Sequence, residues 1–460
     1  MVAAIEALRF VVEPVLFLTF MSMYMEVSLV QQLITRKVCL REFIDCEHTN
    51  STLQNHAASP YITAYNAELS LLTLFVALWF GSWADKYGRR RMMILPSIGS
   101  ILSTLNFIVA SYFIKESPIM VMVSAGVIGC STGTLGVSAT CFGLVSDVTS
   151  AERRSTRVAV MEAMIFTGGA LGFYIVGFMV PRAGFIATFS LELSIHLIIL
   201  LYIIIVIREP ERIRQHELST TSVMSLHHVL SMARTITRPR ENNYRSTLIL
   251  LLFTSLMLSY GMASTTYIMQ MFLKEPPLAW DSSHYSYYHG LLIAVQGCAI
   301  VIGLPICLRF FRMKDSTSGL LGALSRLVGL MWLAISKQSW MVYLSVVLLS
   351  MSEFVMPSVR SIISKIVGSN EKAQLFAFMS ALQSFAFLTG SFLFTGLYNV
   401  TSKNLFPGFG FALAGSLQVI PVATFIYLHF ALDVNALSAP LCTEEEIPRY
   451  DSTEESVAES

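Results

Sequence analysis

Long runs of apolar residues alternate with shorter polar segments along most of the chain. A helix needs about 20 largely apolar residues to cross a bilayer. Only helices and closed barrels satisfy the backbone inside a bilayer, and these runs are too long and too uniformly apolar for barrel strands. The pattern therefore predicts an all-α polytopic membrane protein. We place its twelve transmembrane helices at residues 11–33, 62–84, 92–113, 118–146, 158–181, 184–206, 246–272, 286–308, 317–336, 339–359, 374–398 and 407–432.

Basic residues are shared unequally between the loops that connect these helices. Counted from the N-terminus, the even-numbered loops hold twenty Lys and Arg residues and the odd-numbered loops hold eight. Cytoplasmic loops carry the excess of basic residues in membrane proteins. We therefore expect the even-numbered loops, and both termini, to be cytoplasmic.

One polar loop is much longer than the others and separates six apolar runs from the next six. It predicts an N-terminal half at 1–206, a cytoplasmic linker at 207–245 and a C-terminal half at 246–432. Residues 433–460 form a polar tail that contains TEEEIPRYDSTEES. An acidic segment with so few apolar residues is expected to be disordered.

The composition agrees with a membrane protein and excludes several other classes. Hydrophobic residues make up 54% of the chain and charged residues 13%, against about 25% charged in soluble domains. A net charge of +1 argues against a nucleic-acid partner. The seven cysteines form no CxxC and no Cys/His cluster, so no metal site is expected. We find no nucleophile–base pair, and we expect neither an enzyme nor a bound cofactor.

A concentration of charge follows the second helix, in GSWADKYGRRR. Glycine permits the tight turn of a short loop, and an acid near a helix end can pair with arginine or cap a neighbouring helix. Placed between helices two and three, the segment resembles the major facilitator signature G-x-x-x-D-x-x-G-R-R/K. Gly81, Asp85, Gly88, Arg89 and Arg90 match it. The alternative is a basic membrane anchor with no other role.

Five further segments, spread over most of the chain, carry a closer resemblance: VVEPVLFL, VSDVTSAERRSTRVAVMEA, FLKEPPLAWDS, PSVRSIISKIVGSNEKAQLF and FPGFGF. In this order they resemble solute carrier family 46. The family includes the proton-coupled folate transporter and lysosomal carriers of anionic conjugates and muropeptides. The resemblance implies the major facilitator fold and alternating access of two halves around a site near the membrane midplane. It also implies a small-molecule solute and protons as the coupling ion.

Ionisable residues inside a membrane are functional candidates because they are costly there. The resemblance makes Glu162 the proton-coupling residue and Arg360 a residue that binds an anionic solute or holds a gate. It gives Arg89 and Asp147 roles at the cytoplasmic surface, with Asp147 expected to form salt bridges with Arg153, Arg154 and Arg157. The alternatives are a Glu162 that only pairs between helices and an Arg360 that only anchors the chain.

Further polar residues are candidates for solute contact or gating. Gln32 matches a family glutamine, whereas Glu26 stands where the folate transporter has an amide. Together with Glu68 it makes an acidic cavity, which suits a neutral or cationic solute better than folate; alternatively both acids are protonated or paired. Glu353 lies two turns before Arg360 on the same helix face and is a cavity candidate.

The chain also departs from the family in ways that make folate a doubtful solute. Ser259 stands where the folate transporter has a coupling histidine, and the neighbouring Tyr260 can only hydrogen-bond. The glycine-rich stretch GCSTGTLG lacks the acid that the family has there. Glu192 and His196, spaced i, i+4, can relay a proton, but we expect them to pair with Arg326.

Two further features concern the extracytoplasmic side. The family's loop disulfide lacks one partner here because Ala279 replaces the cysteine, which leaves open whether Cys39 pairs with Cys46. Asn50 heads an N-S-T sequon and is a glycosylation candidate.

These expectations define a proton-coupled symporter of an organic anion or conjugated small molecule, embedded in the bilayer as a monomer or weak homo-oligomer. An uncoupled facilitative carrier and a transport-dead receptor or scaffold are the alternatives. The sequence leaves the plasma membrane and the lysosomal membrane both open.

Overall fold

Helices are the regular structure of the residues that the computed structural model describes, which are 11–44, 46, 51–149, 151–209, 244–367, 369–404 and 406–431. The first group of helices is α2 (Glu13–Glu42), α3 (Ser51–Tyr87), α4 (Arg89–Tyr112), α5 (Ile119–Ser131), α6 (Gly133–Val148) and α7 (Ala151–Ile205). The second group is α10 (Tyr244–Lys274), α11 (Ser282–Cys298), η2 (Ala299–Gly303), α12 (Leu304–Arg309), α13 (Asp315–Ala334), α14 (Ser339–Leu348), η3 (Ser352–Phe354), α15 (Val355–Ile366), α16 (Ser369–Asn404), α17 (Phe409–Leu417) and α18 (Val419–Ala431).

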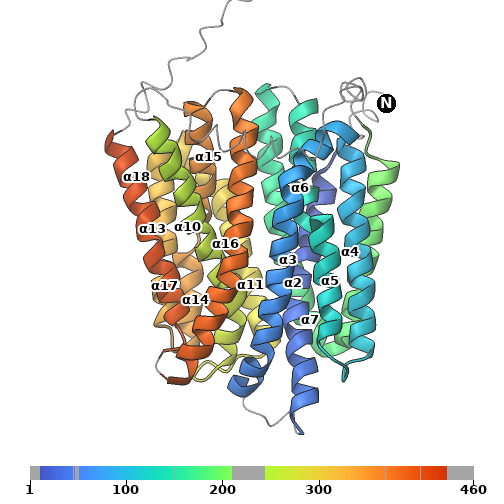
Figure 1. Ribbon diagram of the computed structural model, residues 1–460. Helices are drawn as coiled ribbons and strands as arrows, with labels where there is room; N and C mark the ends of the chain where they lie inside the picture. The colour runs from blue at the N-terminus through green and yellow to red at the C-terminus, as the bar shows by residue number, and fades with distance from the viewer. Residues whose placement is uncertain are drawn as a thin grey trace, which may run out of the picture.

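The helices form an upright bundle with the two groups side by side (Figure 1). Within the first group α2 packs on α7 and α3, and within the second α10 packs on α16 and α17. The groups meet where α7 packs on α11 and where α3 packs on α16. These two contacts place α3 and α7 next to helices of the other group, which is where a site shared by both is built.

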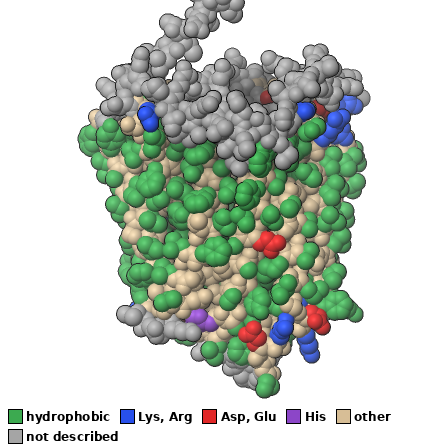
Figure 2. All heavy atoms as spheres, viewed as in Figure 1, with side chains coloured by type: hydrophobic (Ala, Val, Ile, Leu, Met, Phe, Trp, Pro, Cys, Tyr) green, Lys and Arg blue, Asp and Glu red, His purple; other side chains and the backbone are tan. Residues whose placement is uncertain are grey.

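Ten of the described helical segments are long and apolar enough to span a membrane. One of them, Arg157–Ile205, is 49 residues long and contains Gly184 at φ 78°, where two helices meet. The 37-residue α3 is not among the ten, so the count of twelve stays a prediction. Figure 2 shows hydrophobic side chains over the middle of one face and Lys and Arg near its two ends, as a bilayer requires.

Several long helices are interrupted within the bundle. Thr132 has φ 65° and separates α5 from α6. The 3₁₀ turn η3 separates α14 from α15, and the π-helical turn η2 follows α11. Irregular backbone at membrane depth is tolerated where it is buried in protein or lines a cavity. The breaks therefore indicate where the interior of the bundle is specialised.

The contact between α2 and α7 depends on two glycines in the first helix of α7. A Cβ atom on Gly168 would clash with the carbonyl oxygen of Phe17, and one on Gly172 with that of Met21. Glycines four residues apart let membrane helices approach closely. This spacing therefore fixes α7 directly against α2.

The structure answers one open question at the far end of α2. Cys39 and Cys46 form a disulfide with an S–S distance of 2.09 Å. The glycosylation candidate Asn50 lies outside the described residues, as do residues 210–243 of the expected linker and the whole tail at 433–460.

Candidate functional site

The signature segment forms the turn between α3 and α4. Gly88 has φ 97°, a conformation that favours glycine. The Arg89 side chain donates from Nε to Asp147 Oδ2 at 3.0 Å. Gly81 and Asp85 lie in the last two turns of α3. The surroundings of Gly81 and the side chain of Asp85 are outside the described part of the structure.

A carboxylate from the segment predicted as the linker caps the N-terminus of α4. Glu209 accepts from the backbone N–H groups of Arg89, at 2.6 Å, and Arg90, at 2.9 Å. Negative charge at a helix N-terminus is stabilising because the unpaired N–H groups there carry partial positive charge. The Arg90 side chain in turn donates to the carbonyl of Ile203 at 3.2 Å. The segment thus joins the start of α4 to the end of α7.

Arg157 has a different ion-pair partner from the one expected. It donates to Glu13 Oε1, with the closer nitrogen at 3.0 Å, and so ties the start of α2 to α7. Asp147 is paired with Arg89 instead. The expectation that Asp147 pairs with Arg157 was therefore wrong, because α2 supplies an acid that spacing along the chain does not reveal.

A cavity of about 250 Å³ lies between α2, α3, α5, α6, α10 and α16. It draws residues from both helix groups, and Thr132 at the α5–α6 break is one of them. Its polar and aromatic lining includes Glu26, Gln31, Tyr65, Asn66, Tyr267, Gln383, Ser384 and Phe387. Among the described residues that line it there is no Lys, Arg or His. An anionic group would therefore meet an acid here and no compensating cation.

Glu26 connects this cavity to a buried acidic cluster. Tyr65 donates to Glu26 Oε1 at 3.0 Å, and Glu26 interacts electrostatically with Glu192 and His196. His196 Nε2 lies 3.6 Å from Glu192 Oε1. The i, i+4 pair that the sequence predicted is thus formed, and it faces Glu26 rather than the second helix group.

Three predicted residues come together where the helix groups face each other on the side of the signature turn. Glu162, half-buried in the first helix of α7, interacts electrostatically with Arg360 of α15 and with Glu353 of η3. Tyr24 of α2 also interacts with Glu353. Arg360 loses its attraction to Glu162 when Glu162 binds a proton.

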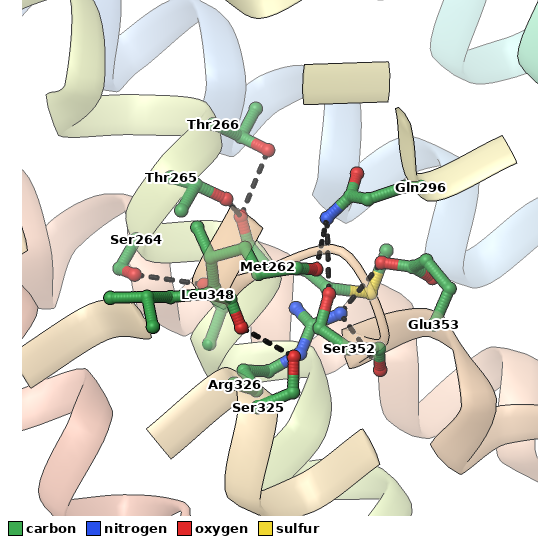
Figure 3. A network of polar contacts seen from close by, with 12 residues as sticks. Met262, Ser264, Thr265, Thr266, Gln296, Ser325, Arg326, Leu348, Ser352 and Glu353 are labelled. Carbon is green, nitrogen blue, oxygen red and sulfur yellow. Dashed lines mark hydrogen bonds and ion pairs between the residues drawn. The ribbon is translucent and has the colours of Figure 1, made fainter. Parts of the chain in front are cut away.

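A polar network holds Glu353 in place (Figure 3). Arg326 donates to Glu353 Oε1 at 2.6 Å and is 4% exposed. Gln296 of α11 donates to Ser352 Oγ at 3.0 Å and to the Leu349 carbonyl at 3.3 Å. The network satisfies backbone groups at the break before α15. The expectation that Arg326 pairs with Glu192 and His196 was wrong, because η3 turns Glu353 toward Arg326.

The remaining predicted residues lie in different settings. Gln32 donates to Ser28 at 2.9 Å, and Ser28 contacts Ser286 of α11 at 3.2 Å, which links the two groups. Tyr260 and Thr389 share a 2.8 Å hydrogen bond between α10 and α16.

Ser259 and Glu68 are not among the described lining residues. Ser259 donates to the Ser255 carbonyl within α10. Glu68 lies beside Gly126 of α5.

Near the disulfide, hydrogen bonds join α3 to the second group. Asn55 donates to the Met271 carbonyl at 3.3 Å, and Asn399 donates to Ser59 at 2.7 Å. Glu275, directly after α10, is 3% exposed. Burial raises the pKa of its carboxyl. This end of the interface is closed by direct contacts.

Comparison with known proteins identifies the class of protein. The model of the Major Facilitator Superfamily matches residues 15–391. The human organic anion transporter MFSD10 has a similar structure, with a TM-score of 0.69, 14% identity and coverage of 92% of this chain and 99% of that one. The chain belongs to the Major Facilitator Superfamily. It is a multi-pass membrane transporter, not an enzyme.

The relatives in sequence are members of solute carrier family 46. The proton-coupled folate transporter of Bos taurus is 26% identical over 424 residues, 89% of this chain and 90% of the relative. The lysosomal proton-coupled steroid conjugate and bile acid symporter SLC46A3 of Gallus gallus is 23% identical over 96% of this chain and 98% of the relative. The family resemblance predicted from the sequence is confirmed.

Proposed function

We propose that the chain is a proton-coupled symporter of an organic anion or conjugated small molecule. Alternating access moves the half at 1–206 against the half at 246–432. The observation that carries the proposal is the interaction of Glu162 with Arg360 and Glu353 across the two groups of helices. The printed names of the relatives, which are proton-coupled carriers of folate or of steroid conjugates and bile acids, support it.

Coupling follows from competition for Arg360. When Glu162 is ionised, its negative charge attracts the guanidinium and repels an incoming anion. A proton on Glu162 removes that charge, so Arg360 becomes available to an anionic group, which it can hold with two hydrogen bonds. Proton and anion therefore favour each other's binding, and this mutual preference is the thermodynamic requirement for symport.

The cavity that Glu26 lines adds a preference for how charge is distributed over the solute. Its described lining has tyrosines, amides and one acid and no basic residue, so it suits an uncharged body better than a second anionic group. A conjugate with one anionic end satisfies both regions, with that end toward Arg360. A dianionic folate satisfies them less well.

We place both termini in the cytoplasm and the protein in the plasma membrane or the lysosomal membrane. The contacts that join α3 to α10 and α16 near the disulfide then lie on the extracytoplasmic side. We expect Gly88, Arg89, Arg90 and Asp147 to stabilise the cytoplasmic turn, and we expect a monomer or weak homo-oligomer.

Uptake into vesicles with an imposed pH gradient tests the proposal. Folates, steroid conjugates, bile acids, muropeptides and other organic anions are compared in the native protein, Glu162→Gln and the control Glu116→Gln, which alters an exposed loop acid. We expect an inward proton gradient to raise uptake in the native protein and the control but not in Glu162→Gln. Uptake that ignores pH indicates a facilitative carrier, and no uptake of any solute indicates a receptor; either result contradicts symport.

A further inference from the structure

A buried acid–imidazole pair lies in the second helix of α7, beyond Gly184. Glu192 is 0% exposed and His196 is 6% exposed. Neither carboxylate oxygen of Glu192 has a hydrogen-bond partner among the described residues, and neither does Nε2 of His196. The distance of 3.6 Å between His196 Nε2 and Glu192 Oε1 is too long for a hydrogen bond. Unpartnered buried polar atoms of this kind call for a ligand or a proton.

The helices around the pair supply acids and aromatic rings. From α2, Glu26 interacts electrostatically with both residues. From α3, Tyr65 interacts with Glu26, Glu192 and Glu68. The charged partners described for Glu26, Glu192 and His196 include no Lys or Arg.

The other neighbours of α7 contribute no charge to the pair. From α4, Phe107 stacks on Phe189, one turn before Glu192, at 5.2 Å between ring centroids. From α11, His289 packs on Phe173 in the first helix of α7, before the bend at Gly184. From α6, Asp147 is paired with Arg89. Phe107 also lies beside Tyr65, at 6.5 Å between ring centroids, so apolar and aromatic rings pack one turn from the pair.

The cluster of Glu26, Glu192 and His196 lacks enough positive charge to balance its two carboxylates. With both carboxylates ionised and the imidazole protonated, Glu26, Glu192 and His196 together carry a net charge of −1. An uncompensated charge in an apolar interior is costly, and such groups neutralise instead. The one cation that the sequence suggested, Arg326, is held by Glu353 at 2.6 Å. The cluster is neutral only when two protons are distributed over its three groups.

We propose that Glu26, Glu192 and His196 form a second proton-binding site, which loads from the central cavity through Glu26. Only Glu26 of the three lines the cavity. A hydronium ion in the cavity therefore gives its proton to this carboxylate first: one O–H bond of the hydronium breaks, an O–H bond on Glu26 forms, and a water molecule remains. Transfer to Glu192 or His196 breaks that bond and forms a new O–H or N–H bond. Tyr65, which donates to Glu26, orients the receiving carboxylate.

This site is distinct from the coupling residue of the proposed function. The charged partners of Glu162 are Arg360 and Glu353, and those of Glu26 are Glu192 and His196. Glu162 and Glu192 also lie in different helices of α7, on opposite sides of Gly184. A site in the first helix group alone can hold its proton whether or not a solute is bound to Arg360. The inference rests on the proposed function only for its role in transport.

Infrared difference spectra of the purified full chain during a pH titration test the site without any solute. Protonated carboxylic acids have a carbonyl band that ionised ones lack. We expect Glu192→Gln to remove one such band that persists in Glu162→Gln and in the exposed control Glu116→Gln. In the single variant His196→Gln, the Glu192 band should persist but its titration midpoint should shift by about one pH unit, because the variant lacks the neighbouring proton acceptor. Spectra of Glu192→Gln that match those of the control would overturn the proposal.

Two additional measurements test the proton site by independent means. If Glu192→Gln does not fold, Glu26→Gln must alter the same bands, because it removes the acid that receives the proton; unchanged bands reject the site. In vesicles, the pH of half-maximal uptake should shift in Glu192→Gln by about one unit, whereas a merely structural role lowers uptake at every pH alike. If the protein transports nothing, the proposed function fails but the infrared result still decides whether the proton site exists.

Discussion

Removing the Glu353 side chain should leave the buried guanidinium of Arg326 without its ion-pair partner. Arg326 is 4% exposed, and its described acceptors are Glu353 Oε1 at 2.6 Å and the Ser352 carbonyl at 3.5 Å. Its Nε has no hydrogen-bond partner among the described residues. After Glu353→Leu, the guanidinium keeps one long hydrogen bond and no counter-charge.

The expected cost is about 3–5 kcal/mol, the range for breaking a buried ion pair by removing one partner. Glu353→Gln should cost less, because the amide oxygen still accepts a hydrogen bond from Arg326. The double variant Arg326→Leu/Glu353→Leu removes both charges and should fall within about 1–2 kcal/mol of the native protein, since replacing a buried pair by apolar residues is often nearly neutral.

Denaturant unfolding in mixed micelles measures these free energies, with Arg309→Leu as the control for loss of an exposed arginine. The double variant should be more stable than Glu353→Leu, which gives a coupling energy of about 2 kcal/mol or more. If the effects of Glu353→Leu alone and Arg326→Leu alone simply add in the double variant, the ion pair does not hold η3.

Three further perturbations follow from the structure. Gly172→Ala should lower the unfolding free energy by about 1–3 kcal/mol because its Cβ meets the Met21 carbonyl, whereas Gly396→Ala, with nothing within 4 Å, should not; equal effects would contradict close packing of α2 on α7. Glu209→Gln should cost about 0.5–2 kcal/mol by weakening the cap of α4, which denaturant unfolding also measures; no loss would argue against the cap. Because burial raises the pKa of Glu275, its carboxyl stabilises the folded state most at acidic pH. That stability should fall as pH rises from about 4.3 through the raised pKa, whereas Glu275→Gln should show a flatter thermal-unfolding profile between these pH values.

Periodicity and residue type predicted the helical framework well. The break expected between residues 181 and 184 coincides with the non-helical Gly184, because glycine is the residue that tolerates positive φ. The signature turn at Gly88 was also predicted, since its residue types determine a local conformation. Such features depend on neighbours in the chain, and a single sequence contains that information.

Ion-pair partners were predicted poorly because they depend on contacts between helices. Arg326 was assigned to Glu192, whereas the turn η3 brings Glu353 to it. Glu209, which caps α4, was placed in the linker because the sequence shows only a polar segment after helix six. The acid was visible, but its partner lies 120 residues earlier in the chain.

Proton movement driven by the solute is the direct test of symport through Glu162. Proteoliposomes that contain a pH-sensitive dye, with no imposed gradient, receive a solute that the uptake screen has identified. We expect solute entry to acidify the interior with native protein and Glu162→Gln to abolish this acidification. Solute entry without any change of internal pH would contradict proton-coupled symport.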